Sequence, residues 1–330
     1  MKKKALWMGA FACLIASMSW GAMFPVADHA LQYIDPFYFA TIRYGIVSLL
    51  LVILLWWREG SRAFRTEGKM RYLLFFGTMA FTVYNLFIFM GQSQMGQSGV
   101  IVASIMETLM PIITILIIWF LYKTRPKNYM LLSIIVAFIG ASLVITKGEL
   151  HFFSELSSQA LPLFLIFLGV TGWVVYTMGG QRFIGWSTLR YSTLTCLIGT
   201  SVTAIITGIL TWQGSIVMPT MHVMDTIKYD MLFMSSFPGI IALLCWNYGV
   251  KQLNALNGVL FINFVPITTL LIMMWQGYQI TVFDLVGTSL VIIALVANNL
   301  YQRHDLRNRK LSFILTKKTY RGKHFLPSNT

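Results

Sequence analysis

The sequence predicts an all-α membrane protein whose ten transmembrane helices form two inverted repeats of five. Three observations lead to this fold class: an apolar composition, ten separate apolar runs, and short sequence patterns that recur at a nearly constant offset. Of the 330 residues, 57% are hydrophobic and only 11% are charged, and the mean hydropathy is +0.70. A soluble domain carries about 25% charged residues, so this chain belongs in a bilayer.

The ten apolar runs are each close to the 17 to 25 residues, roughly, that cross a bilayer as a helix. They occupy residues 5–24, 37–57, 72–91, 98–122, 129–146, 160–179, 188–212, 231–250, 257–276 and 282–301. The first run resembles a secretory signal peptide, because "MKKK" precedes it and small residues such as Ala16 and Ser17 offer a cleavage point. The nine further runs favour a retained first helix.

Basic residues orient the chain. If the N-terminus is cytoplasmic, 21 of the 25 lysines and arginines fall in inner segments, and only Lys147 and Lys228 fall in outer ones. The positive-inside rule then places both termini in the cytoplasm of a cell that carries the protein in its plasma membrane. The net charge of +14 is explained by this asymmetry rather than by a nucleic-acid partner. The basic tail 302–330 can lie on anionic headgroups or stay solvated.

Short patterns recur in the same order along the two halves. "GASLVI" at 140–145 returns as "GTSLVI" at 287–292, and "IRY" at 42–44 returns as "LRY" at 189–191, both at an offset of 147. "MPIITILI" at 110–117 returns as "VPITTLLI" at 265–272. Five spans per half is an odd number, so the second half must cross the membrane in the opposite sense. The glycines of these patterns also suit close helix packing.

The repeat divides the chain into four parts. Residues 1–146 form the first repeat, 147–159 an outer connecting loop, 160–301 the second repeat and 302–330 a basic cytoplasmic tail.

Polar side chains within the spans are the first candidates for a transport path. Glu107 is the only carboxylate deep within a span, and Ser104 shares its helix face. Thr82 and Asn85 follow a similar stripe one span earlier. These residues line a cavity or form hydrogen bonds between helices. For Glu107 we favour the cavity, because ionisable residues within membranes are usually functional.

Two prolines and two arginines lie within spans. Pro111 and Pro266 each remove a helical hydrogen bond at mid-span, which predicts a static kink or a gating hinge. Arg43 and Arg190 are related by the repeat and should approach opposite membrane faces, where snorkelling to the headgroups is the simplest expectation. Arg43 can alternatively pair with Glu107 or bind an anionic substrate group.

Aromatic and amide side chains complete the candidate cavity. Trp20 and Trp173 take nearly matching positions in spans 1 and 6, and Tyr84 lies well inside span 3. Their simplest role is helix packing, but their faces can also line the path of an amphipathic solute. Asn247 and Asn263 add polar groups to spans 8 and 9.

A family resemblance rests on residues 16–55, "ASMSWGAMFPVADHALQYIDPFYFATIRYGIVSLLLVILL", and on the prolines of spans 4 and 9 and the "GxSLVI" endings. This stretch resembles the start of an EamA-type repeat of the drug/metabolite transporter superfamily. The resemblance covers about residues 5 to 301. It implies ten helices around a central cavity, alternating access, and transport of amino acids, other metabolites or drugs, commonly outward. The related small multidrug resistance proteins carry a glutamate in their first helix, which this chain lacks there.

Other function classes find little support in the sequence. The five histidines, His29, His151, His222, His304 and His324, fall in loops or in the tail, and no pair of carboxylates lies within the spans, so an enzyme is not expected. Cys13, Cys196 and Cys245 fall in different spans, so no metal site is expected, and no motif implies a cofactor.

The sequence therefore predicts a secondary transporter that exports amino acids or similar small amphipathic metabolites. Export of drugs or cations, uptake of metabolites, and a non-transporting scaffold or sensor are the alternatives. The expected partners are a small-molecule substrate, the lipid bilayer, a proton as coupling ion and a second copy in a homodimer.

Overall fold

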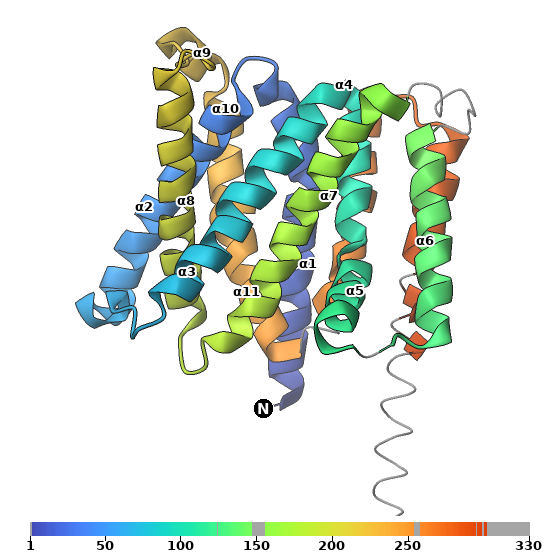
Figure 1. The fold of residues 1–330 in the computed structure, drawn as a ribbon, viewed down its shortest axis with the longest axis horizontal. Helices are drawn as coiled ribbons and strands as arrows, with labels where there is room; N and C mark the ends of the chain where they lie inside the picture. Colours follow the sequence, from blue (N-terminus) through green and yellow to red (C-terminus); the bar gives the residue numbers. More distant parts are fainter. Residues whose placement is uncertain are drawn as a thin grey trace, which may run out of the picture.

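A computed structural model describes residues 2–123, 125–146, 156–253, 258–294, 296–298 and 300–301, and all regular secondary structure in these ranges is helical (Figure 1). Six helices are long and apolar enough to cross a membrane: Ala5–Leu31, Pro36–Glu59, Met70–Thr108, Ala160–Arg182, Thr188–Trp212 and Lys228–Leu253. Four shorter apolar helices are Met110–Leu121, Asn128–Val144, Phe261–Trp275 and Val282–Asn298. The predicted all-α multi-pass membrane protein is confirmed.

The helices carry the labels of Figure 1. They are α1 (Lys2–Leu31), α2 (Pro36–Glu59), α3 (Met70–Gly77), α4 (Asn85–Thr108), α5 (Met110–Tyr122), α6 (Asn128–Thr146), α7 (Leu156–Gly179), α8 (Thr188–Trp212), α9 (Met221–Thr226), α10 (Lys228–Met234), α11 (Ala242–Leu253) and α13 (Phe264–Trp275). Side-chain caps start several of them: Asp35 accepts from the amide of Phe37, and Ser187 accepts from the amide of Arg190. Residues 147–155 of the predicted connecting loop and the whole tail 302–330 lie outside the described residues.

The chain reverses direction inside α4. Gly96 has φ 56° and ψ −141°, a conformation that glycine adopts without a steric penalty. A β-carbon on Gly99 would lie 2.3 Å from the carbonyl oxygen of Gln92, whereas residues seven apart on a straight helix are separated by about 10 Å. Figure 1 shows α4 rising to one end of the bundle and descending toward α5. Met70–Thr108 is thus two antiparallel arms, with the turn where the sequence predicts the boundary between spans 3 and 4.

Two π-helical turns, which the sequence did not predict, interrupt spans 3 and 8. One, η2, spans Thr78–Tyr84 between α3 and α4, and the other, η5, spans Ser235–Ile241 between α10 and α11. In η2, the side chain of Asn85 donates to the carbonyl oxygen of Ala80 at 2.8 Å. In η5, Pro238 has no amide hydrogen to donate. Such turns occur frequently at functional sites.

Glycines bring helices into close contact. A β-carbon on Gly140 of α6 would lie 2.6 Å from the carbonyl oxygen of Gly287, and one on Gly287 would lie 2.5 Å from that of Gly140. Gly77 and Gly199 make a similar contact between α3 and α8. The packing role expected for the repeated glycines is therefore present, because a larger side chain would push these helices apart.

Candidate functional site

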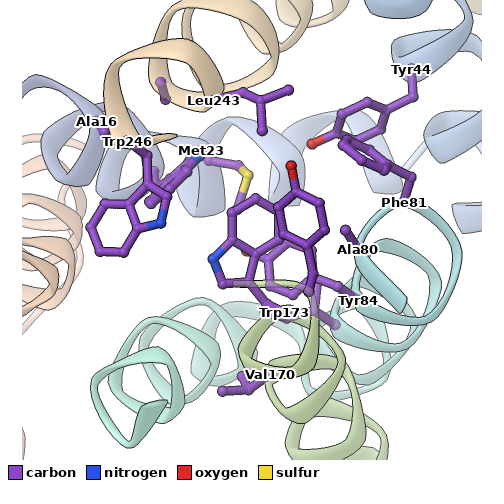
Figure 2. Close-up of a cluster of buried hydrophobic side chains, with 14 of the residues drawn as sticks. Ala16, Met23, Tyr44, Ala80, Phe81, Tyr84, Val170, Trp173, Leu243 and Trp246 are labelled. Atoms are coloured by element: carbon purple, nitrogen blue, oxygen red, sulfur yellow. The ribbon is translucent and has the colours of Figure 1, made fainter. Parts of the chain in front are cut away.

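Five buried aromatic side chains meet at the centre of the helix bundle. Trp20 of α1 lies 5.4 Å from Trp173 of α7 and 5.1 Å from Trp246 of α11, measured between ring centroids. Trp173 also lies 5.1 Å from both Tyr84 and Tyr176. Figure 2 shows Tyr84, Trp173 and Trp246 converging from three different helical segments. We call these five residues the aromatic cluster.

Two indole groups of the aromatic cluster have unused donors. Trp20 Nε1 donates to the carbonyl oxygen of Pro238 at 3.3 Å, in the π-helical turn η5. Nε1 of Trp173 and Nε1 of Trp246 are buried, and neither has a hydrogen-bond partner in the described part of the chain. In the view of Figure 2 these two nitrogens lie on the sides of their rings that face each other. A buried donor without a partner is costly, so these positions suit a ligand that supplies an acceptor.

Glu107 lies beside the aromatic cluster and is only 1% exposed. The Tyr84 hydroxyl donates a hydrogen bond to its Oε1. Its Oε2 is buried and has no partner among the described residues. The carboxyl group is therefore half-satisfied, and its second oxygen remains available to a cation, a donor or a proton.

Arg43 is fully buried, and the expectation that it snorkels to the headgroups is wrong. Its Nε donates to the carbonyl oxygen of Met234 at 3.1 Å, Nη1 to Asn85 Oδ1 at 3.5 Å, and Nη2 to Met23 Sδ at 3.4 Å. Its guanidinium carbon lies 4.7 Å from the ring centroid of Tyr44. Other helices cover the side chain, so it has no route to the headgroups.

Arg43 and Glu107 share neighbours without forming an ion pair with each other. Arg43 contacts Asn85, and Glu107 contacts the preceding residue, Tyr84. The direct Arg43–Glu107 pair considered from the sequence is therefore not formed, although the two groups belong to one site.

The remaining hydroxyl and amide candidates are held by other contacts. Thr82 donates to the carbonyl oxygen of Gly199 at 2.9 Å, and Ser104 donates to that of Ile101, on its own helix, at 2.8 Å. Asn247 donates to Ser192 Oγ at 2.8 Å. The contacts of Thr82 and Asn247 join neighbouring helices, whereas that of Ser104 stays within its own helix. Asn247 also donates to the hydroxyl of Tyr176, in the aromatic cluster, at 3.3 Å. Asn263 differs, because its buried Oδ1 has no partner in the described residues.

Arg190 lies in a surface cluster rather than in the site. Its Nη2 donates to Glu67 Oε1 at 2.8 Å and to the carbonyl oxygen of Arg65 at 2.5 Å, and its guanidinium carbon lies 3.9 Å from the Trp186 ring centroid. Trp186 Nε1 donates to the other oxygen of Glu67 at 2.8 Å. Hydrogen bonds from Trp186 and Arg190 lower the pKa of Glu67. We call Glu67, Trp186 and Arg190 the loop latch, because it ties the segment before α3 to the start of α8.

The two prolines lie directly after interruptions of their helices. Pro111 occupies the first turn of α5, directly after the break at Leu109, and Pro266 occupies the first turn of α13. Proline is tolerated there because the first-turn amides have no acceptor within the helix. The helix is therefore interrupted directly before each proline, which agrees with the kink expected from the sequence, and the gating hinge stays a prediction.

Sequence reasoning missed Met23, Tyr44 and Glu67 as site or latch residues. The recurrence of "IRY" and "LRY" could have drawn attention to Tyr44, because Tyr191 is its counterpart. Tyr191 packs at 5.1 Å against Tyr176 of the aromatic cluster. Met23 and Glu67 carry no such signal, because their roles depend on partners distant in the sequence.

Comparisons with known proteins give a consistent result. The sequence pattern described as the EamA-like transporter family matches residues 7–146 and again residues 160–300. "Uncharacterized transporter YrdR" of Bacillus subtilis (strain 168) is 60% identical over 305 residues, which cover 92% of this chain and 95% of that protein. "Uncharacterized transporter YyaM" of the same organism is 28% identical, with 84% of this chain and 88% of that protein covered.

A solved crystal structure of a protein shares the fold. Its TM-score is 0.66 at 16% sequence identity, and the match covers 90% of this chain and 98% of that one. At this identity the likeness shows the fold alone.

Proposed function

This chain belongs to the EamA-like transporter family, and from that premise we propose that it is a secondary transporter that exports amino acids or similar small amphipathic metabolites. The observation that carries the proposal is the double match of the family, once to each half of the chain. The half-satisfied Glu107 beside buried aromatic rings adds a site that a small amphipathic solute could occupy.

The proposed architecture is ten transmembrane helices in two inverted repeats that alternate access to a central site. The two family matches support the domain boundaries at 1–146, 147–159, 160–301 and 302–330. Gly140 and Gly287 are equivalent in the repeat and contact each other, which is the arrangement expected where a pseudo-twofold axis passes between them. The π-helical turns add to this support, since Thr78–Tyr84 and Ser235–Ile241 occur at corresponding places in the two halves.

Orientation and location follow from the distribution of charge. Basic residues gather in the segments that carry the N-terminus and the 58–71 loop, which lie toward the same end of the bundle in Figure 1. We place this end and both termini in the cytoplasm and the chain in the plasma membrane.

Glu107 is the proposed coupling group. A carboxyl group whose second oxygen has no partner can exchange a proton for substrate, because neither form is locked by a fixed cation. In reconstituted vesicles, export should respond to an imposed pH gradient, and Glu107→Gln should abolish the response while leaving the protein folded. Flux that stays equally gradient-sensitive in Glu107→Gln would remove this residue from the coupling mechanism.

The function itself is tested by solute flux. Untargeted metabolite profiling of the medium from cells that overexpress or lack the protein should identify a solute whose export depends on it, and vesicles should then transport that solute. Accumulation inside the cells would indicate uptake, and flux restricted to lipophilic cations would indicate drug export. Vesicles that move no solute at all would favour a scaffold or sensor.

A further inference from the structure

Two opposite charges are buried in the same part of the bundle, and each keeps unused hydrogen-bonding capacity. Arg43 is 0% exposed and contacts a carbonyl, an amide oxygen and a thioether, but no carboxylate within the described residues. Glu107 has one oxygen bound by Tyr84, and the other has no partner in the part of the chain that the structure describes. Buried charges persist when a partner compensates them, and neither compensates the other here.

The chemistry of the two groups is complementary to a zwitterion. A guanidinium presents a planar fork of donors that matches a carboxylate. In Arg43 only Nε makes an ordinary hydrogen bond, at 3.1 Å, whereas Nη1 contacts Asn85 at 3.5 Å and Nη2 contacts a thioether, so the fork is only partly used. A buried carboxylate oxygen matches an ammonium group. An amine or an acid alone would satisfy one of the two charges and leave the other as it is.

The side chains beside the two charges are mainly aromatic. Tyr84, which donates to Glu107, lies 5.1 Å from Trp173 between ring centroids, and Trp173 lies 5.4 Å from Trp20. Tyr44 lies under the guanidinium of Arg43. Rings of this kind accommodate an apolar side chain, and tryptophan and tyrosine faces also attract an ammonium group.

We propose that Arg43 and Glu107 together bind a zwitterionic substrate, with its carboxylate at Arg43, its ammonium group at Glu107 and an apolar side chain in the aromatic cluster. This inference rests on the proposed transport function and deepens it, because it assigns substrate selectivity to two named charges. It also gives Arg43 a reason to be buried that helix packing does not supply.

The test compares solutes that share a side chain and differ only in charged groups. One set is L-leucine, 3-methylbutylamine and 4-methylpentanoate, and a second set is L-phenylalanine, 2-phenylethylamine and 3-phenylpropionate. Binding to the detergent-purified full chain is measured by tryptophan fluorescence and by thermal stabilisation. In at least one set the zwitterion should bind at least about tenfold more tightly than either partial analogue, because a site built around a polar group rejects solutes that lack it.

Substitutions test which charged group of the substrate each of the two residues binds. Arg43→Lys should reduce the preference for the zwitterion over the amine, and Glu107→Gln should reduce its preference over the acid. Arg190→Lys and Glu67→Gln are matched controls, because they alter the same residue types in the loop latch and should leave both preferences unchanged. The wild-type comparison stands even if a variant fails to fold.

The outcomes separate this inference from the transport function. If neither zwitterion binds more tightly than its amine and its acid analogues, the assignment of Arg43 and Glu107 to the two charges of the substrate is wrong, whatever the vesicles transport. Vesicles that export a cation or a neutral solute would retain the transporter and overturn only this inference. If vesicles transport no solute but the purified protein still binds a zwitterion selectively, the binding site is supported and the proposed transport function is wrong.

Discussion

The contact between Tyr84 and Glu107 allows a quantitative test of the site. Tyr84→Phe removes only the hydroxyl that donates to Glu107 Oε1, and the ring and its packing against Trp173 remain. Glu107 Oε2 already lacks a partner among the described residues, and the residue is only 1% exposed, so water cannot replace the lost donor without rearrangement. A hydrogen bond to a charged group contributes about 1.5–3 kcal/mol. We expect the free energy of unfolding to fall by this amount.

The measurement is reversible unfolding of the purified protein in mixed micelles, followed by circular dichroism, in a double-mutant cycle. In a Glu107→Gln background the partner is neutral, so Tyr84→Phe should cost only about 0.5–1.5 kcal/mol. The difference between the two backgrounds is the coupling energy of the pair. Tyr229→Phe is the control, because Tyr229 is 73% exposed and its loss of a hydroxyl should change little. If Tyr84→Phe lowers the free energy of unfolding equally in both backgrounds, the view that Tyr84 stabilises Glu107 in its ionised form is refuted.

Three further predictions concern other parts of the chain. In a cysteine-free background, a cysteine placed at the exposed Gln94 should react with an impermeant thiol reagent in intact cells, whereas a cysteine placed at Thr66 should not. The reverse labelling would overturn the proposed topology. The loop latch should stabilise the fold fully above the unfolded pKa of glutamate, about 4.3, and lose this contribution as the pH falls through the lowered pKa of Glu67. Glu67→Gln should therefore flatten the acid limb of a plot of stability against pH, and an unchanged limb would contradict the assignment. Gly287→Leu should destabilise the fold by about 1–3 kcal/mol, as measured by thermal unfolding, because the larger side chain would overlap with Gly140. Gly214→Leu is the control, because Gly214 has open space around it but a positive φ, so this substitution tests backbone strain without steric overlap.

Hydropathy and length could locate the helices but not their internal irregularities. The predicted boundary between spans 3 and 4 coincides with the reversal at Gly96, because a bilayer-sized apolar run must end there. The π-helical turns could not be foreseen, since they depend on local partners such as Asn85 with Ala80. The mid-span prolines predicted interruptions, but hydropathy does not reveal that α4 ends at Thr108 and a new helix begins at Met110.

Part of the buried cluster that forms the candidate site could be located from the sequence, and the errors in the predicted contacts have one physical cause. Glu107, Trp20, Tyr84 and Trp173 were chosen because polar and aromatic residues at depth are unusual, and the structure brings them together. The snorkelling expectation for Arg43 treats a helix as if it were alone in lipid. Its actual partners lie 20, 42 and 191 residues away along the chain, so only the folded bundle shows that it is covered.

The two arginines of the "IRY" and "LRY" patterns show how one duplicated residue can take two roles. Each reaches from its own half to the other: Arg43 of α2 donates to Met234 at the start of η5, and Arg190 of α8 donates to Glu67 before α3. Both contacts therefore join the two halves, which would move relative to each other under the proposed alternating access. Arg43 makes its contact in the buried interior beside Glu107, whereas Arg190 makes its contact at the surface, where Glu67 is half-exposed. Under the proposed topology, loss of Arg190 weakens closure of the transporter at the cytoplasmic face, whereas loss of Arg43 removes the cation of the central site. The same substitution should therefore change gating when it is made at Arg190 and substrate selectivity when it is made at Arg43.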